Sequence, residues 1–357
     1  MRTHKNPTTG LPQALIQQPE RRRTSIEFIL RAALIVLFLF SLSACKKSPP
    51  ARSSSLRSAD CCAAYQHSDS LPEQSPQNVT RLAIGGDARD DRSGVLPWAL
   101  GEAKRRGAKA FFFLGDLELT RSLDKLIARQ LAALNGLPFY PLMGNHEVEF
   151  LGILRLPDSE HAINEFKEDF LKSPGLKLAP LKYVVAYSVD LPGDVHWIAM
   201  DNVSRKGEGF GPEQLSWLAA DLQAASTAKK IIFVGMHKGL ANNPVTTHAM
   251  DEDGPSAVAD SNSALALFKQ YKVAAVFVSH SHMYAAYDQE GIPVRLTGGL
   301  GAPLVKGLSD MDGGLHHFLL VDVPNPSSNQ SPPQIEVVKF RGKSVQDEDD
   351  EVNEKER

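Results

Sequence analysis

The sequence predicts an α/β protein in which buried strands alternate with helices. Runs of consecutive apolar residues, such as Ala110 to Leu114, are separated by segments of helical character. Such continuous runs are typical of strands that are covered on both faces. Five of the runs end in glycine or another small residue followed by Asp, Asn or His. The chain has 357 residues, of which 42% are hydrophobic and 23% charged, and this composition fits a globular protein with a large core.

The expected elements follow one another from residue 79 onward. The first part should contain strands at 79–84, 110–114 and 138–143 and helices at 95–106 and 121–134. After an insert at 151–180 we expect strands at 183–190 and 195–201, a helix at 212–225, a strand at 231–234, a helix at 262–271 and a strand at 273–278. The last strands should lie at 293–297, 316–323 and 334–340. Pro212 suits the first turn of its helix, where its missing N–H has no partner to lose.

The N-terminal segment has the features of a secretory signal. Arg21–Arg23 precede an apolar run whose uninterrupted part, 32–40, is too short for the roughly 20 residues of a membrane span. The run ends in Leu42-Ser43-Ala44-Cys45, which resembles a bacterial lipobox. We therefore expect residues 1–44 to be a lipoprotein-type signal peptide, with a lipid on Cys45 that anchors the protein to the membrane of the bacterial cell envelope. Lys46 follows rather than Asp, so an outer-membrane or periplasmic lipoprotein is expected. The alternative is a signal-anchor helix with an incidental cysteine.

The remaining segments bound the possible functions. Residues 45–78 should form a flexible Ser/Pro-rich tether, residues 79–342 one domain and residues 343–357 an acidic disordered tail. All three cysteines precede the domain, so any metal in it must be held by nitrogen and oxygen ligands. The charge of −3, from 39 basic and 42 acidic residues, argues against a nucleic-acid partner.

Polar residues gather at the ends of the five apolar strands. These ends read Gly86-Asp87, Gly115-Asp116, Gly144-Asn145-His146-Glu147, Met236-His237 and Ser279-His280-Ser281-His282. One such end is usually a capped turn, but ligands of open α/β sheets bind beyond the carboxyl ends of strands, and five such ends in one chain favour a common site. Carboxylates, neutral imidazoles and an amide oxygen suit Mn, Fe, Zn and related divalent ions.

In this order, the stretches resemble the calcineurin-like metallophosphoesterase superfamily, over about residues 79–323. Residues 210–218 and the glycine-rich turn 298–301 add to the resemblance. It implies a four-layer α/β/β/α sandwich of two mixed sheets and two divalent metal ions (Mn, Fe, Zn or Co). The ligands carried over are Asp87, Asp116 and His282 for the first ion and Asp116, Asn145, His237 and His280 for the second, with Asp116 bridging. His146 would be the general acid.

Two positions depart from the pattern of the superfamily. Arg89 stands where a histidine ligand is expected, and a guanidinium is a poor metal ligand but a good clamp for phosphate. Leu119 stands where the family often has Asp or Tyr. We therefore expect a weakened first metal site, and no purple tyrosinate band in an iron-loaded sample. Glu118 or Asp90 are possible substitutes for the missing side chain.

The expected function is hydrolysis of a phosphoric ester, either a monoester or a diester. A metal-activated hydroxide would attack phosphorus, His146 would protonate the leaving group, and Arg89 would stabilise the developing charge. The alternative is a non-catalytic envelope lipoprotein that keeps the fold and binds phosphate or a partner. A second enzymatic alternative is hydrolysis of nucleotides or cyclic nucleotides. His248, in the loop 241–262, is either a substrate contact or a surface residue.

Overall fold

The computed structural model of the protein describes residues 78–89, 91, 93–117, 136–148, 159–205, 209–325 and 332–342. The expected signal peptide, the tether up to residue 77, the helix at 121–134 and the acidic tail lie outside these ranges, as do Asp90, Glu118 and Leu119. Within the ranges, no helix combines the length and apolar character that a membrane crossing requires.

The first sheet contains five strands and is mixed. In spatial order these are β12 (Gln334–Lys339), β11 (His317–Pro324), β1 (Val79–Gly85), β2 (Ala110–Phe113) and β3 (Phe139–Pro141). β1, β2 and β3 run parallel, whereas β11 is antiparallel to both β1 and β12. The carboxyl ends of the three parallel strands therefore open at the same edge of the sheet.

The second sheet contains seven strands and is also mixed. Its order is β4 (Lys177–Leu178), β5 (Tyr187–Leu191), β6 (Val195–Ala199), β7 (Ile231–Gly235), β8 (Ala275–Val278), β10 (Ile292–Thr297) and β9 (Tyr284–Gln289). The central strands β6, β7, β8 and β10 are parallel, β5 and β9 run antiparallel to them, and β4 is antiparallel to β5.

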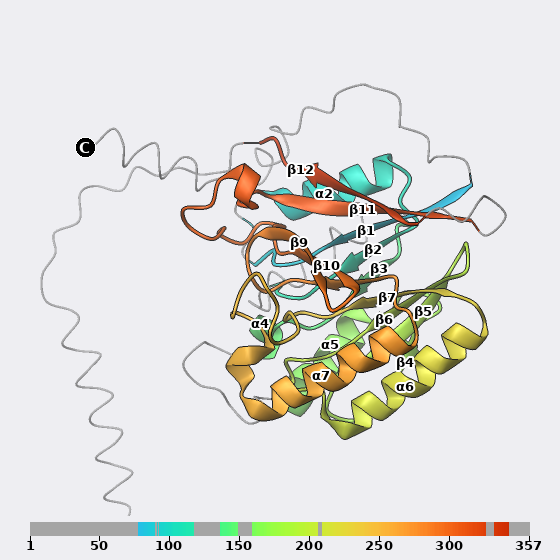
Figure 1. Ribbon diagram of the computed structural model, residues 1–357. Helices are drawn as coiled ribbons and strands as arrows, with labels where there is room; N and C mark the ends of the chain where they lie inside the picture. Colours follow the sequence, from blue (N-terminus) through green and yellow to red (C-terminus); the bar gives the residue numbers. More distant parts are fainter. Residues whose placement is uncertain are drawn as a thin grey trace, which may run out of the picture. The chain divides into compact units, whose positions relative to one another are not determined.

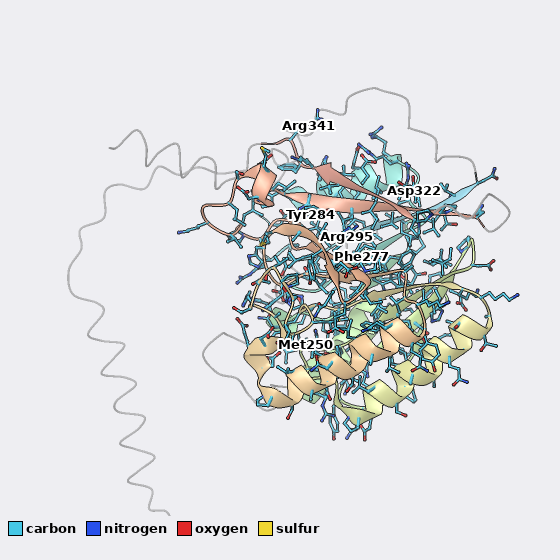
Figure 2. The ribbon with its side chains drawn as sticks, in the orientation of Figure 1. Met250, Phe277, Tyr284, Arg295, Asp322 and Arg341 are labelled. Carbon is cyan, nitrogen blue, oxygen red and sulfur yellow. The ribbon has the colours of Figure 1, made fainter. Side chains whose placement is uncertain are left out.

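The two sheets pack face to face, and helices cover their outer faces (Figure 1). Between the sheets, Phe112 of β2 stacks on Trp197 of β6 with 4.0 Å between ring centroids, and Phe277 of β8 joins the same core. Figure 2 shows how densely side chains fill the interior around Phe277. α2 (Val95–Arg105) packs on the first sheet, and α6 (Gly211–Thr227) and α7 (Pro255–Gln270) pack on the second. The expected four-layer sandwich is confirmed.

Burial on both faces explains the continuous apolar runs in the sequence. Along β1, Leu82 and Ile84 point toward the second sheet, whereas Ala83 between them packs against the layer that contains α2. Most residues of the central strands are therefore screened from water, and the alternation of polar and apolar residues that marks a half-exposed strand is lost.

The structure differs from the expected elements where the sequence is polar. α7 begins at Pro255, seven residues before the expected start at 262. The sequence did not predict its first two turns because exposed and half-buried residues predominate there, which leaves little apolar pattern. β9 was not expected: this edge strand is mostly half-exposed, and its apolar part is limited to alanine and tyrosine. The insert contains α5 (Ser159–Phe170) and β4. The remaining short helices are α4 (Asn145–Val148), η2 (Met250–Asp253) and η3 (Asp310–Asp312).

Candidate metal centre

The six expected metal ligands all lie beyond the carboxyl ends of parallel strands. Asp87 follows β1, Asp116 follows β2, Asn145 starts α4 beyond β3, His237 follows β7, and His280 and His282 follow β8. Backbone hydrogen bonds join these loops: Asp87 N–H donates to the Gly115 carbonyl at 3.0 Å, and Gly86 N–H donates to the Thr297 carbonyl at 3.1 Å. The edges of the two sheets thus form one polar site.

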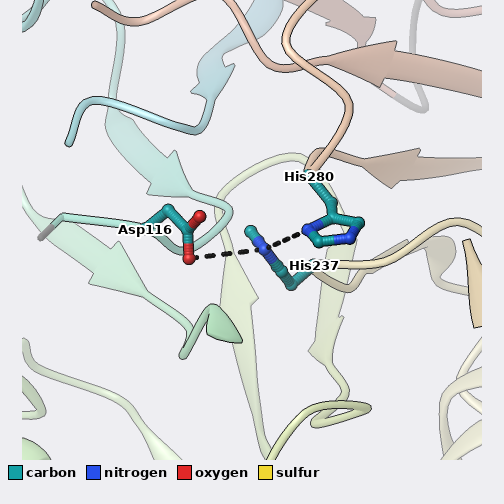
Figure 3. A group of neighbouring side chains, drawn as sticks. All are labelled: Asp116, His237 and His280. Atoms are coloured by element: carbon teal, nitrogen blue, oxygen red, sulfur yellow. Dashed lines mark hydrogen bonds and ion pairs between the residues drawn. The ribbon is translucent and has the colours of Figure 1, made fainter. Parts of the chain in front are cut away.

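One group of donors combines Asp116, His237 and His280 (Figure 3). Asp116 Oδ1 lies 3.4 Å from His237 Nε2, and His280 Nδ1 lies 3.2 Å from the same nitrogen. Asn145 Oδ1 is 3.0 Å from His237 Nε2. These four residues are the set that the sequence assigned to the second ion, and the fold brings them together.

A second group of donors combines Asp87, Asp116 and His282. His282 Nε2 lies 3.6 Å from Asp87 Oδ1. Asp87 is fully buried, and this oxygen has no hydrogen-bond partner among the described residues. A buried carboxylate oxygen without a donor is costly, and a cation would compensate it. Asp116 belongs to both groups, which is the position of a bridging ligand.

Backbone carbonyls fix the orientation of two of the imidazoles. His237 Nδ1 lies 2.7 Å from the Leu114 carbonyl, and His282 Nδ1 lies 2.7 Å from the Pro303 carbonyl. Because a carbonyl oxygen can only accept, both Nδ1 atoms carry the proton and both Nε2 lone pairs face the site. Hydrogen bonds of this kind orient metal-ligating histidines in many proteins.

The loops reach this arrangement through an unusual backbone. Asp87, Asp116 and His280 have φ angles of 60°, 62° and 71°, in the left-handed region. Asp and His adopt this region more readily than most residues, but at some cost. Close approach also requires glycine nearby: a side chain at Gly144 would overlap the Asp116 carboxylate, and one at Gly298 would press on Asp87.

Glu147 organises the turn that presents Asp116. Its buried carboxylate accepts backbone N–H bonds from Gly144 at 2.5 Å, Asp116 at 2.9 Å and Leu117 at 2.7 Å. Ser279 helps to hold Asp87 in place, because its hydroxyl donates to Asp87 Oδ2. The same oxygen also accepts a hydrogen bond from the His280 N–H at 2.8 Å. Sequence analysis gave neither Glu147 nor Ser279 a role, although both lie inside the quoted motifs.

The electrostatics of the site favour a cation. Burial raises the pKa of Asp87 to about 7. Burial, together with the charges of Asp87 and Glu147, raises the pKa of Asp116 well above its usual range. Burial lowers the pKa of His237 to about 3 and also lowers the pKa of His280 and His282, so the imidazoles are neutral and offer lone pairs. Crowded carboxylates beside neutral imidazoles fit divalent metal ions.

The two residues expected to act on substrate lie at this site. The His146 N–H donates to Asp116 Oδ1 at 3.0 Å, and its Nε2 lies 3.7 Å from Asp116 Oδ2, with 27% of the side chain exposed. The Arg89 N–H donates to the Asp116 carbonyl at 2.9 Å. Burial raises the pKa of Asp87 and Asp116, and the positive charge of Arg89 partly opposes this shift at both carboxyl groups. His248 stacks on His280, with 4.0 Å between ring centroids.

Fold and site together define a metal-binding α/β/β/α sandwich protein with donors for divalent cations. A family model for calcineurin-like phosphoesterases matches residues 87–284, more than half of the chain. The chain belongs to the calcineurin-like phosphoesterase family. No curated protein sequence matches it significantly.

Solved structures share the fold at low sequence identity. A dimetal phosphatase from Danio rerio is 13% identical, with a TM-score of 0.54, over 74% of this chain and 97% of that one. Plasmodium GAP50, described as the anchor in the inner membrane complex, is 13% identical, with a TM-score of 0.52, over 75% and 87%. The purple acid phosphatase PPD1 from yellow lupin is 17% identical, with a TM-score of 0.50, over 77% and 55%.

Proposed function

We propose that the protein hydrolyses phosphoric esters with two divalent metal ions held at this site. The observation that carries the proposal is the pair of overlapping donor groups that share Asp116. Two divalent ions in such groups would acidify a water molecule and neutralise charge on a phosphoryl oxygen. The chain supplies the ligands, their orientation and the residues that meet the substrate.

His146 is the proposed general acid. Its backbone N–H donates to Asp116, whereas its ring is partly exposed. A substrate phosphate placed at the centre would bring the leaving-group oxygen within reach of the ring. A positioned proton donor of this kind contributes about 10²–10⁴-fold to turnover.

Arg89 is the proposed phosphate clamp. It follows Asp87 by two residues, and its backbone N–H donates to the Asp116 carbonyl at 2.9 Å, so its backbone lies beside the loops of both carboxylates. Its guanidinium cannot replace the histidine ligand expected there, but it can bind two phosphate oxygens at once. Its charge is therefore placed to stabilise the negative charge that grows during phosphoryl transfer.

The test begins with chelated protein, to which Mn, Fe, Zn or Co is returned before assay with an aryl phosphate and a bis-aryl phosphate. Activity that returns with a metal supports hydrolysis, and the better substrate distinguishes monoesterase from diesterase. We expect His146→Ala to lose about 10²–10⁴-fold in kcat. The variant should keep the metal content of the wild type, because the His146 side chain belongs to neither donor group. Full turnover in His146→Ala would remove the general-acid role.

Lack of turnover with every metal and substrate, nucleotides included, would favour the non-catalytic alternative, in which Arg89 binds phosphate without hydrolysis.

We also propose that the lipid on Cys45 holds this domain in the bacterial cell envelope. That part of the proposal rests on the sequence of residues 1–45 alone.

A further inference from the structure

The loop that contains η2 approaches the metal centre from the side of His280. His248 lies flat against the His280 ring, with an angle of 24° between the ring planes. The Ser281 hydroxyl donates to the His248 carbonyl at 3.1 Å and so fixes this part of the loop beside the ligand. Glu252, on η2, lies 2.6 Å from His248 Nδ1 through Oε1 and 3.9 Å from His280 Nε2 through Oε2.

The two nitrogens of His280 face different surroundings. Nδ1 points into the donor group, 3.2 Å from His237 Nε2. Nε2 points away from that group and is buried, without a hydrogen-bond partner in the described ranges, and the whole residue is only 7% exposed. A neutral imidazole has one lone pair and one N–H. If Nδ1 provides the lone pair to an ion, the proton must sit on Nε2, where it needs an acceptor.

His237 makes this requirement strict. Its own Nδ1 donates to the Leu114 carbonyl, so its Nε2 carries a lone pair. In the metal-free protein, His280 Nδ1–H can satisfy that lone pair across the 3.2 Å contact. If both residues held an ion through these nitrogens, both nitrogens would have to present lone pairs, and the His280 proton would have to sit on Nε2. Glu252 presents a carboxylate oxygen on that side, 3.9 Å from Nε2.

We propose that Glu252 is a positioning residue for the second metal ion, accepting the Nε2–H of His280 and fixing the tautomer that binds through Nδ1. The 3.9 Å separation is beyond hydrogen-bond length, but the Glu252 side chain is 43% exposed and can close it by rotation about its own bonds. His248 holds the other carboxylate oxygen and limits that rotation. The proposal rests on the proposed metal centre, and its test separates the two.

The same residues do not form an independent third metal site. His248, Glu252 and His280 lie close enough to hold an ion. However, a neutral His280 that ligates through Nε2 would lose Nδ1 as a ligand of the second ion.

Outer hydrogen-bond partners of ligating histidines typically change metal affinity by about 10–100-fold, which is an effect of measurable size.

The experiment measures Mn²⁺ binding to the chelated full-length protein by equilibrium dialysis, with the EPR spectrum reporting whether two Mn²⁺ ions are coupled. We expect Glu252→Ala to lower the affinity for one of the two Mn²⁺ ions by about 10–100-fold. The EPR spectrum of the coupled pair should then give way to that of a single ion. Glu252→Gln keeps an acceptor oxygen and should recover much of the affinity. Asp251→Asn removes the same charge from a neighbouring carboxylate that accepts from the Asn242 N–H, and should leave binding unchanged.

The results separate the claims. A wild-type protein that binds no Mn²⁺ overturns the proposed metal centre itself. If the wild type binds two ions, equal affinity in Glu252→Ala overturns the positioning role. An equal loss of Mn²⁺ affinity in Asp251→Asn would also overturn it, because it would indicate a general effect of the removed charge. An equal loss of affinity for both ions in Glu252→Ala would overturn it too, because it would indicate a merely structural role. His248→Phe, which keeps the ring stack but not the Nδ1 contact, should fall between the wild type and Glu252→Ala.

Discussion

Replacing Glu147 with glutamine tests whether the Asp116 turn is held by a buried carboxylate. Three backbone N–H groups donate to Glu147, two to Oε2 and one to Oε1. An amide offers one acceptor oxygen and one NH₂ group. In its best orientation the glutamine keeps the bonds from Gly144 and Asp116 and turns its NH₂ toward the Leu117 N–H, so that two buried donors face each other.

The magnitude follows from that count. One hydrogen bond to a charged group contributes about 1.5–3 kcal/mol, and leaving its buried donor unsatisfied adds to the cost. In the opposite direction, removing the charge of Glu147 relieves repulsion with Asp116, whose pKa is raised by burial first and then by the charges of Asp87 and Glu147. We therefore expect Glu147→Gln to lower the free energy of unfolding of the chelated protein by about 2 kcal/mol.

Urea denaturation measures this change. For an m-value of about 2–3 kcal/mol/M, the midpoint should fall by about 0.7–1 M. Bound Mn²⁺ should fall as well, because Asp116 loses the turn that orients it. Glu213→Gln makes the same chemical change at an exposed site in the first turn of α6 and should stay within about 0.5 kcal/mol of the wild type. An unchanged midpoint with full Mn²⁺ content would refute the reasoning.

Two further predictions concern backbone contact and pH. Gly144→Ala should reduce Mn²⁺ binding at least tenfold, because the added methyl overlaps the Asp116 carboxylate, and dialysis that shows wild-type affinity would contradict this. His196 lies 2.8 Å from an Asp190 oxygen and 2.9 Å from an Asp221 oxygen. Burial alone would lower the pKa of His196, but these two hydrogen bonds outweigh it and raise the pKa. The stabilisation is complete below about pH 6.5 and is lost as pH rises through the folded-state pKa, so the urea midpoints of the wild type and His196→Gln should converge from pH 6 to pH 9.

Most of the strands, and the polar residues proposed as ligands, could be predicted because both leave a local signal. A strand buried on both faces is a continuous apolar run, and a ligand at its carboxyl end is a polar residue after a small one. β1 and Asp87 show both signals within nine residues of chain, from Val79 to Asp87. The resemblance to a known family then supplied the grouping of the ligands, which spacing alone does not determine.

The features that sequence analysis missed depend on contacts between distant segments. Glu252 approaches His280 across 28 positions of the chain, and nothing in the acidic stretch around it distinguishes it from its neighbours. β9 is an edge strand whose pairing with β10 is set by the fold and not by an apolar pattern. Glu147 was visible in its motif, but its three backbone partners are not readable from the residues themselves.

The left-handed backbone at Asp87, Asp116 and His280 has a consequence for how such a protein changes over time. Residues other than glycine in sparsely populated conformations cost on the order of 1 kcal/mol each. Glycine at these three positions would relax the chain and erase its cation donors in the same step. The conformational cost of the three left-handed residues is therefore one that cation binding would offset, because the side chains that carry this cost are the proposed donors.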